Sequence, residues 1–242
     1  MLTQIFVASL IFIALIFTIL NLSIVGKEFT CNRYILNTYL YIILSFNLVA
    51  LSILLMDYYK MRFIPNIMVY LGIFLISLAC IVLIHNIDSR NLIIKHIIWA
   101  VFILSLSVIF YPIYNKYKNK KYLIMSSVIT TLFLFIALSF IAYIKPEWIS
   151  MSIGPILLVL LFCGILFEVL TYFINRNNIE KITSSMKFFS CFFIGLFMIF
   201  ILYDTKRLQI NARECINADY IKESLGLFLD IFNIFVRILG LR

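Results

Sequence analysis

Long apolar stretches alternate with short polar ones along the whole chain. Seven of them approach the roughly 20 residues that a helix needs to cross a hydrocarbon core of about 30 Å. They cover residues 5–25, 35–56, 63–84, 93–111, 122–144, 153–174 and 186–203. An eighth, shorter stretch covers residues 225–241 and contains Asp230, Asn233 and Arg237. This pattern predicts an all-α, polytopic membrane helix bundle.

The prolines support these boundaries. Pro65, Pro112, Pro146 and Pro155 all lie at or just outside the end of a predicted stretch, where the missing N–H of a proline costs a helix least. Connections are short except for residues 204–224, so consecutive helices are expected to be antiparallel neighbours in one bundle. We expect the first stretch to be a retained helix, because residues 1–4 contain no Lys or Arg and no small-residue cleavage pattern follows it.

Composition strengthens this interpretation. Of the 242 residues, 64% are hydrophobic and 13% are charged, against about 45–50% apolar and about 25% charged in a soluble domain. With a mean hydropathy of +1.09, a water-soluble globule is excluded. The formal net charge is +9. In a membrane protein such an excess of basic residues normally lies in short loops that face anionic lipid, so it gives no reason to expect nucleic acid as a partner.

The orientation in the membrane is ambiguous from charge. Lys27 and Arg33 follow the first stretch and predict that the first connection is cytoplasmic, whereas of all 20 basic residues nine fall on that side and eleven on the other. Cys31 and Cys215 lie in connections on the side of the first connection. A bridge between them is geometrically allowed, but a cytoplasmic face would keep them reduced.

Three acidic residues fall inside or at the edge of apolar stretches: Glu168, Asp204 and Asp230. An ionisable side chain in hydrocarbon is costly, so each is a candidate functional residue. Asp204 ends the seventh predicted stretch and has an alternative interpretation as an interfacial residue. Glu168 is expected either to line the same path as the aspartates or to pair with a cation in a loop.

The eighth stretch has a polar stripe. Glu223, Asp230, Asn233 and Arg237 are spaced by 7, 3 and 4 residues, which places them on one face of a helix. Each charge near the centre costs roughly 2.5–3.5 kcal/mol on insertion scales, so we expect this helix to turn its stripe into a bundle. The alternative is a helix that lies in the interface or re-enters from one side, with a solvated stripe.

The same C-terminal residues resemble a known family. Residues 201–205 read ILYDT, residues 219–221 read DYI, and residues 224–235 read SLGLFLDIFNIF. They are similar to the C-terminal signature of the Bax inhibitor, or lifeguard, family, and residues 32–39 (NRYILNTY) resemble the entry to that family's first helix. On this register residues 35–242 form the seven-helix family domain, and residues 1–34 form an extra N-terminal transmembrane helix and its loop.

The resemblance implies a bundle with its last helix near the centre and two aspartates, Asp204 and Asp230, facing each other. It also implies calcium leak from internal stores, sensitivity to pH and suppression of cell death. Some members pair an aspartate with an arginine of the family's second helix. Residues 63–84 contain no cation here, and Arg237 is the candidate substitute.

The chemistry of such a pair follows from physical principles. Two carboxyl groups close together in a low-dielectric site cannot both ionise cheaply, so they share a proton. Once both are deprotonated they favour a cation, and calcium, which takes six to eight oxygen ligands, suits two carboxylates supplemented by Asn233, backbone carbonyls and water. We therefore expect Asp204 and Asp230 to sense protons and to bind calcium transiently, with no resident cofactor.

The sequence leaves three functions to compare. The first is a pH-sensitive cation leak, calcium first, with an effect on cell survival or stress tolerance. The second is a non-conducting protein that binds and restrains another membrane protein, such as a protease. The third, an intramembrane aspartyl protease, is disfavoured because Leu227, Phe228 and Leu229 stand where its Gly-x-Gly should precede Asp230. The sequence also contains no G-x-S-x-G, no H-E-x-x-H and no phosphate-binding glycine loop. The membrane is expected to be endoplasmic reticulum or Golgi in a eukaryotic or viral setting, and the cell membrane in a bacterial one.

Overall fold

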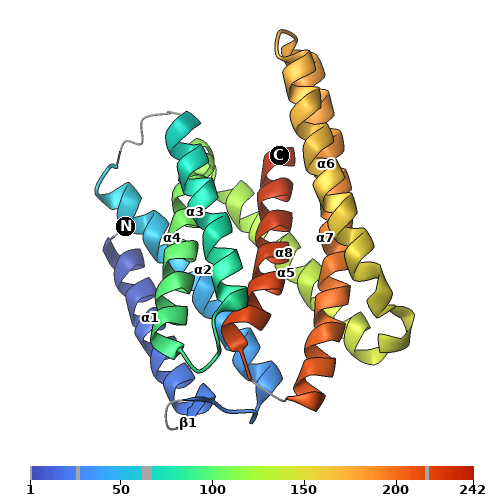
Figure 1. Cartoon of the computed structure of the whole chain (residues 1–242). Helices are drawn as coiled ribbons and strands as arrows, with labels where there is room; N and C mark the ends of the chain where they lie inside the picture. Colours follow the sequence, from blue (N-terminus) through green and yellow to red (C-terminus); the bar gives the residue numbers. More distant parts are fainter. Residues whose placement is uncertain (1, 26–27, 62–66, 216–217) are drawn as a thin grey trace. The chain divides into compact units, whose positions relative to one another are not determined.

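The computed structural model describes residues 2–25, 28–61, 67–215 and 218–242 (Figure 1). Within these residues eight helices are long and apolar enough to cross a membrane. They are α1 (Leu2–Ser23), α2 (Tyr34–Tyr58), α3 (Ile67–Asn86), α4 (Leu92–Tyr117), α5 (Lys121–Ile144), α6 (Gly154–Asn175), α7 (Ile179–Glu214) and α8 (Tyr220–Leu241). The remaining elements are two short antiparallel strands, β1 (Ile24–Val25) and β2 (Glu28–Phe29), and two 3-10 turns, η1 (Pro146–Trp148) and η2 (Met151–Ile153). The predicted all-α polytopic architecture is confirmed.

The chain divides into two compact units. Unit 1 comprises Met1–Asn119 and Ala212–Phe228, and unit 2 comprises Lys120–Asn211 and Leu229–Arg242. Most of α7 therefore belongs to unit 2. Helix α8 contributes its first nine residues to unit 1 and the rest to unit 2.

In unit 1, α2 packs against both α1 and α4, and α3 packs against α4 (Figure 1). The interior is rich in aromatic side chains with polar tips, which bury apolar surface while their N–H or O–H finds a partner. Trp99 donates its indole N–H to the Ser45 hydroxyl at 3.2 Å, and the Tyr41 hydroxyl and His96 Nε2 are 2.8 Å apart. Lys118, just beyond α4, donates to Asp57 at 2.8 Å, and this hydrogen bond raises the pKa of Lys118 above its ordinary value.

A buried ion pair in unit 1 fixes the beginning of α8. Lys95 is fully buried and pairs with Asp219, while its ammonium also donates to the Ile87 carbonyl at 2.9 Å. The other carboxylate oxygen of Asp219 accepts from the Lys222 N–H at 3.1 Å. Asp219 thus caps the helix that starts at Tyr220, and aspartate is one of the preferred residues at the N-cap of a helix.

In unit 2, polar contacts join α5 to α7. Gln209 donates to the Ala142 carbonyl at 3.2 Å, and the hydroxyls of Ser139 and Thr205 are 3.4 Å apart. Helix α6 approaches α7 at Gly164, where an added Cβ would lie 2.8 Å from Cε1 of Phe192. Close approach at this point depends on the absence of a side chain.

Several predicted helix ends are corrected. Helix α4 continues through Pro112 to Tyr117 instead of ending at residue 111; the proline removes one ladder hydrogen bond, which the rest of a 26-residue helix tolerates. The predicted long connection, residues 204–224, is mostly helical, since α7 runs for 36 residues to Glu214 and α8 already begins at Tyr220. With 22 residues, α8 reaches about 33 Å, enough to cross a membrane. Pro65 lies outside the described residues.

The expectation for the two cysteines in the connections is also corrected. Cys31 and Cys215, expected to be reduced, are joined by a disulfide within unit 1. The remaining cysteines, Cys80, Cys163 and Cys191, are free and lie within helices.

Candidate functional site

The two aspartates of the predicted site both belong to unit 2. Asp204 lies on α7 and Asp230 on α8, and both residues are buried, with 9% and 5% of their surface exposed. Asp204 does not end its helix as expected, because α7 continues for ten more residues to Glu214. The expectation that Asp204 ends a helix is therefore wrong.

The charges around the two aspartates are unequal. The Nη1 atom of Arg207 lies 3.5 Å from Oδ1 of Asp204, one helical turn away on α7. Asp230 experiences the charges of both Asp204 and Arg207. The pair is therefore a cluster of three ionisable groups, and Arg207 is the member that sequence analysis missed.

Asp230 has an unsatisfied oxygen. Within the described part of the chain, its Oδ2 atom is buried and has no hydrogen-bond partner. Buried polar atoms are nearly always satisfied, so such an exception calls for an explanation. A carboxylate in this position favours a proton or a cation, because leaving the charge buried and unpaired costs several kcal/mol, on the order of 3–5 when a partner is removed.

Glu168 and Arg237 form a second charged group in unit 2. The guanidinium of Arg237 on α8 grips the Glu168 carboxylate on α6 with two hydrogen bonds; the Nη2 to Oε2 distance is 2.7 Å. Arg237 also stacks on the ring of Phe193 on α7, with Cζ 4.3 Å from the ring centroid. Glu168 thus has a cation as its partner, but the cation comes from a helix and not from a loop.

The predicted stripe has two further members, Asn233 and Glu223. The Asn233 side chain is half-buried and donates to the Leu229 carbonyl of its own helix at 2.8 Å. Glu223 is half-buried and belongs to the part of α8 assigned to unit 1. Among these residues the structure therefore joins Arg237 to Glu168 and places Asp230 within electrostatic range of Asp204.

The two aspartates are few as oxygen donors for a metal ion. In the ranges that the structure describes, no group of three or more His, Cys, Asp or Glu residues could hold a metal ion. Asp204 and Asp230 together supply at most four carboxylate oxygens, fewer than the six to eight ligands of calcium.

Eight helices of spanning length and apolarity, with charged groups enclosed among the last of them, define an integral, multi-pass α-helical membrane protein. The family model described as "Inhibitor of apoptosis-promoting Bax1" matches residues 31–241. The chain therefore belongs to the Bax inhibitor family, and the resemblance carried by residues 201–235 is confirmed. The match begins after α1, which ends at Ser23. No curated protein matches the chain.

Proposed function

We propose that this protein is a pH-sensitive cation leak, with calcium as the first candidate ion, and that Asp204 and Asp230 form its proton-sensing and ion-binding site. The observation that carries the proposal is Asp230: a buried carboxylate with an unpartnered oxygen in the described part of the chain, within range of a second acid. An intramembrane acid of this kind is typical of an ion or proton pathway.

The proposed cycle uses the repulsion between two carboxylates. At low pH one shared proton removes the repulsion between Asp204 and Asp230 and leaves the site closed. As the pH rises, that proton leaves, and the one positive charge of Arg207 does not balance the two negative charges of the aspartates. A calcium ion then binds transiently to the carboxylates, with Asn233, backbone carbonyls and water as further oxygen ligands.

An effect on cell survival or stress tolerance is part of the proposal. Its support is the description of the family, which names inhibition of a death-promoting protein. A regulated leak from an internal store supplies a physical route to such an effect, because it sets how much calcium the store can release. We propose no enzymatic activity for the chain.

The test is calcium flux into liposomes that contain the purified protein, followed with an enclosed dye between pH 5 and pH 8. Asp204→Asn and Asp230→Asn are expected to shift or remove the pH response. Two comparisons accompany them: Glu168→Gln, which is expected to keep most of the response, and Glu180→Gln, a matched control at an exposed acid near the start of α7. A pH response that is unchanged in both Asn variants would refute the assignment.

Two other outcomes favour the alternatives. Absence of flux in every form, together with capture of a membrane-protein partner from native membranes, would favour the binding function over conduction. Cleavage of a peptide bond that both Asn variants abolish would favour a protease.

A further inference from the structure

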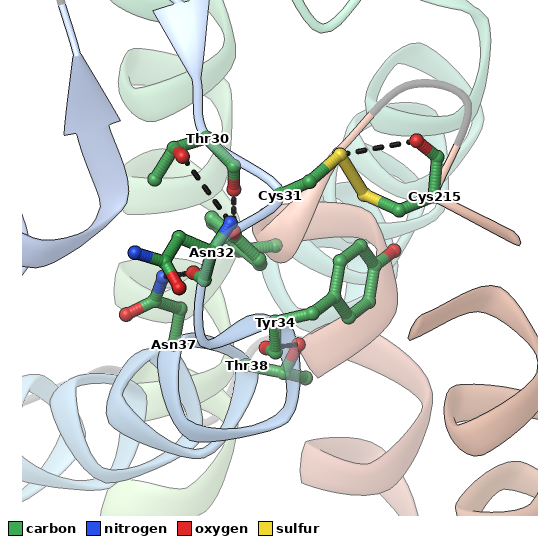
Figure 2. The surroundings of a disulfide bond; sticks show 8 residues. Thr30, Cys31, Asn32, Tyr34, Asn37, Thr38 and Cys215 are labelled. Atoms are coloured by element: carbon green, nitrogen blue, oxygen red, sulfur yellow. Dashed lines mark hydrogen bonds between the residues drawn. A yellow bond between two sulfur atoms is a disulfide. The ribbon is translucent and has the colours of Figure 1, made fainter. Parts of the chain in front are cut away.

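A disulfide joins two connections that are far apart in the sequence. Cys31 lies between β2 and α2, and Cys215 follows the last residue of α7; they are separated by 184 positions (Figure 2). Their Cα atoms are 6.0 Å apart, within the range that a disulfide requires. Both residues belong to unit 1, so their juxtaposition is defined within one compact body.

Neighbouring contacts hold the same two connections together. The Tyr220 hydroxyl donates to the Thr30 carbonyl, and the Tyr220 ring packs edge-on against Phe29 with centroids 5.1 Å apart. Tyr220 itself is fully buried. Thr30 and Phe29, just before Cys31, therefore contact Tyr220, five positions after Cys215, independently of the disulfide.

A bond at this place carries information about the compartment. Cys31 is exposed and Cys215 is half-buried, so cellular thiols have access to the bridge. Exposed disulfides form and persist in oxidising compartments, and the cytosol keeps such pairs reduced. Two thiols lose two protons and two electrons when they join; a disulfide of an oxidoreductase in that compartment accepts them and becomes a dithiol.

We infer that the end of unit 1 that carries Cys31 and Cys215 faces an oxidising, non-cytosolic compartment. Because the spans alternate in direction, the connection between α4 and α5 then faces the cytosol. That short connection and its flanks contain Lys116, Lys118, Lys120 and Lys121, which is the pattern expected of a cytosolic loop. This reverses the orientation predicted from Lys27 and Arg33.

The inference does not depend on the proposed cation leak. It concerns which side of the membrane each connection faces, and a protein that conducts nothing would have the same arrangement. It also predicts that the ends of α1 and α8 that are farthest from the disulfide, at Leu2 and Leu241, lie on the cytosolic side.

The first experiment tests the bond in the full chain. Cells expressing the protein are lysed in N-ethylmaleimide, and the denatured protein is reduced and treated with a maleimide of 5 kDa polyethylene glycol, a reagent that adds a visible mass to each newly freed cysteine. Two additions are expected after reduction and none without it. Cys31→Ser and Cys215→Ser should each abolish both additions, and Cys191→Ser, at a free cysteine, should keep them. No additions after reduction would overturn the inference.

The second experiment tests the side. Ser89→Cys, between α3 and α4, and Asn119→Cys, between α4 and α5, are each placed in a Cys31→Ser/Cys215→Ser background. In sealed microsomes, whose cytosolic face is outside, a membrane-impermeant maleimide should label Asn119→Cys directly and Ser89→Cys only after detergent is added. The opposite labelling pattern would overturn the inference even if the bond exists.

Discussion

The pairing of Glu168 with Arg237 makes a quantitative prediction about stability. Removing one partner from a fully buried pair costs about 3–5 kcal/mol, because the other charge remains enclosed. Here the side chains keep 15% and 23% of their exposure, so we expect about 2 kcal/mol for Glu168→Gln and for Arg237→Gln. At roughly 2–4 °C per kcal/mol for a chain of this size, each variant should melt about 4–8 °C below the parent.

The double variant separates pairing from other losses. If the two side chains act through each other, Glu168→Gln/Arg237→Gln should melt close to the single variants, because no unpaired charge remains, and the coupling energy should be about 1–2 kcal/mol. Arg237→Lys should fall between the parent and Arg237→Gln, since a lysine keeps the charge but loses the two-pronged grip and the stacking on Phe193.

The assay is thermal melting of the purified protein in detergent at one fixed pH. The readout is the fraction of protein that remains monodisperse on size-exclusion chromatography after heating. Glu180→Gln is the control for loss of an exposed acid. A double variant whose decrease equals the sum of the two single decreases would show that Glu168 and Arg237 are not coupled, and the reasoning would fail.

The remaining predictions use the same melting assay. Gly164→Ala should lower the melting temperature and cost about 1–3 kcal/mol of stability, because its Cβ would lie 2.8 Å from a ring atom of Phe192. The matched control is Gly195→Ala, whose Cβ would have nothing within 4 Å. It should be neutral or should stabilise the protein by up to about 1 kcal/mol. Lys95→Met should be among the most damaging single changes, at about 3–5 kcal/mol, because it leaves Asp219 without its buried partner, and an added Asp219→Asn should recover part of that loss.

The apolar pattern predicted the helices well but not their ends. Hydropathy detects the part of a helix that lies in lipid, and the apolar signal of α7 stops at Tyr203. Most of the residues from 206 to 214 (KRLQINARE) are good helix formers, chiefly Lys, Arg, Leu, Gln, Ala and Glu, so α7 continues to Glu214. Ending the helix early concealed Arg207, which lies one turn beyond Asp204 on the same face. The i, i+3 spacing would have identified it once the helix was extended.

Contacts between helices could not be obtained from one sequence. The spacing along α8 correctly placed Asp230 and Arg237 on one face, but it contains no information about which helix that face meets. Glu168 lies on α6 and binds Arg237, and neither residue carries a local sign of the other. The same holds for Cys31 and Cys215, which are 184 positions apart in the sequence and meet only in the folded chain.

The distribution of cations in unit 2 identifies which acid should control the pH response. Arg237 grips Glu168, and Arg207 lies 3.5 Å from Asp204, so a guanidinium adjoins each of these acids. Asp230 is as enclosed as Asp204, yet its Oδ2 has no hydrogen-bond partner among the residues described. A proton is the smallest ligand that relieves this state, and a passing cation is the next. Within the proposed leak, Asp230 is therefore the group at which a proton and a cation compete, and Asp204 with Arg207 sets the field in which they do so.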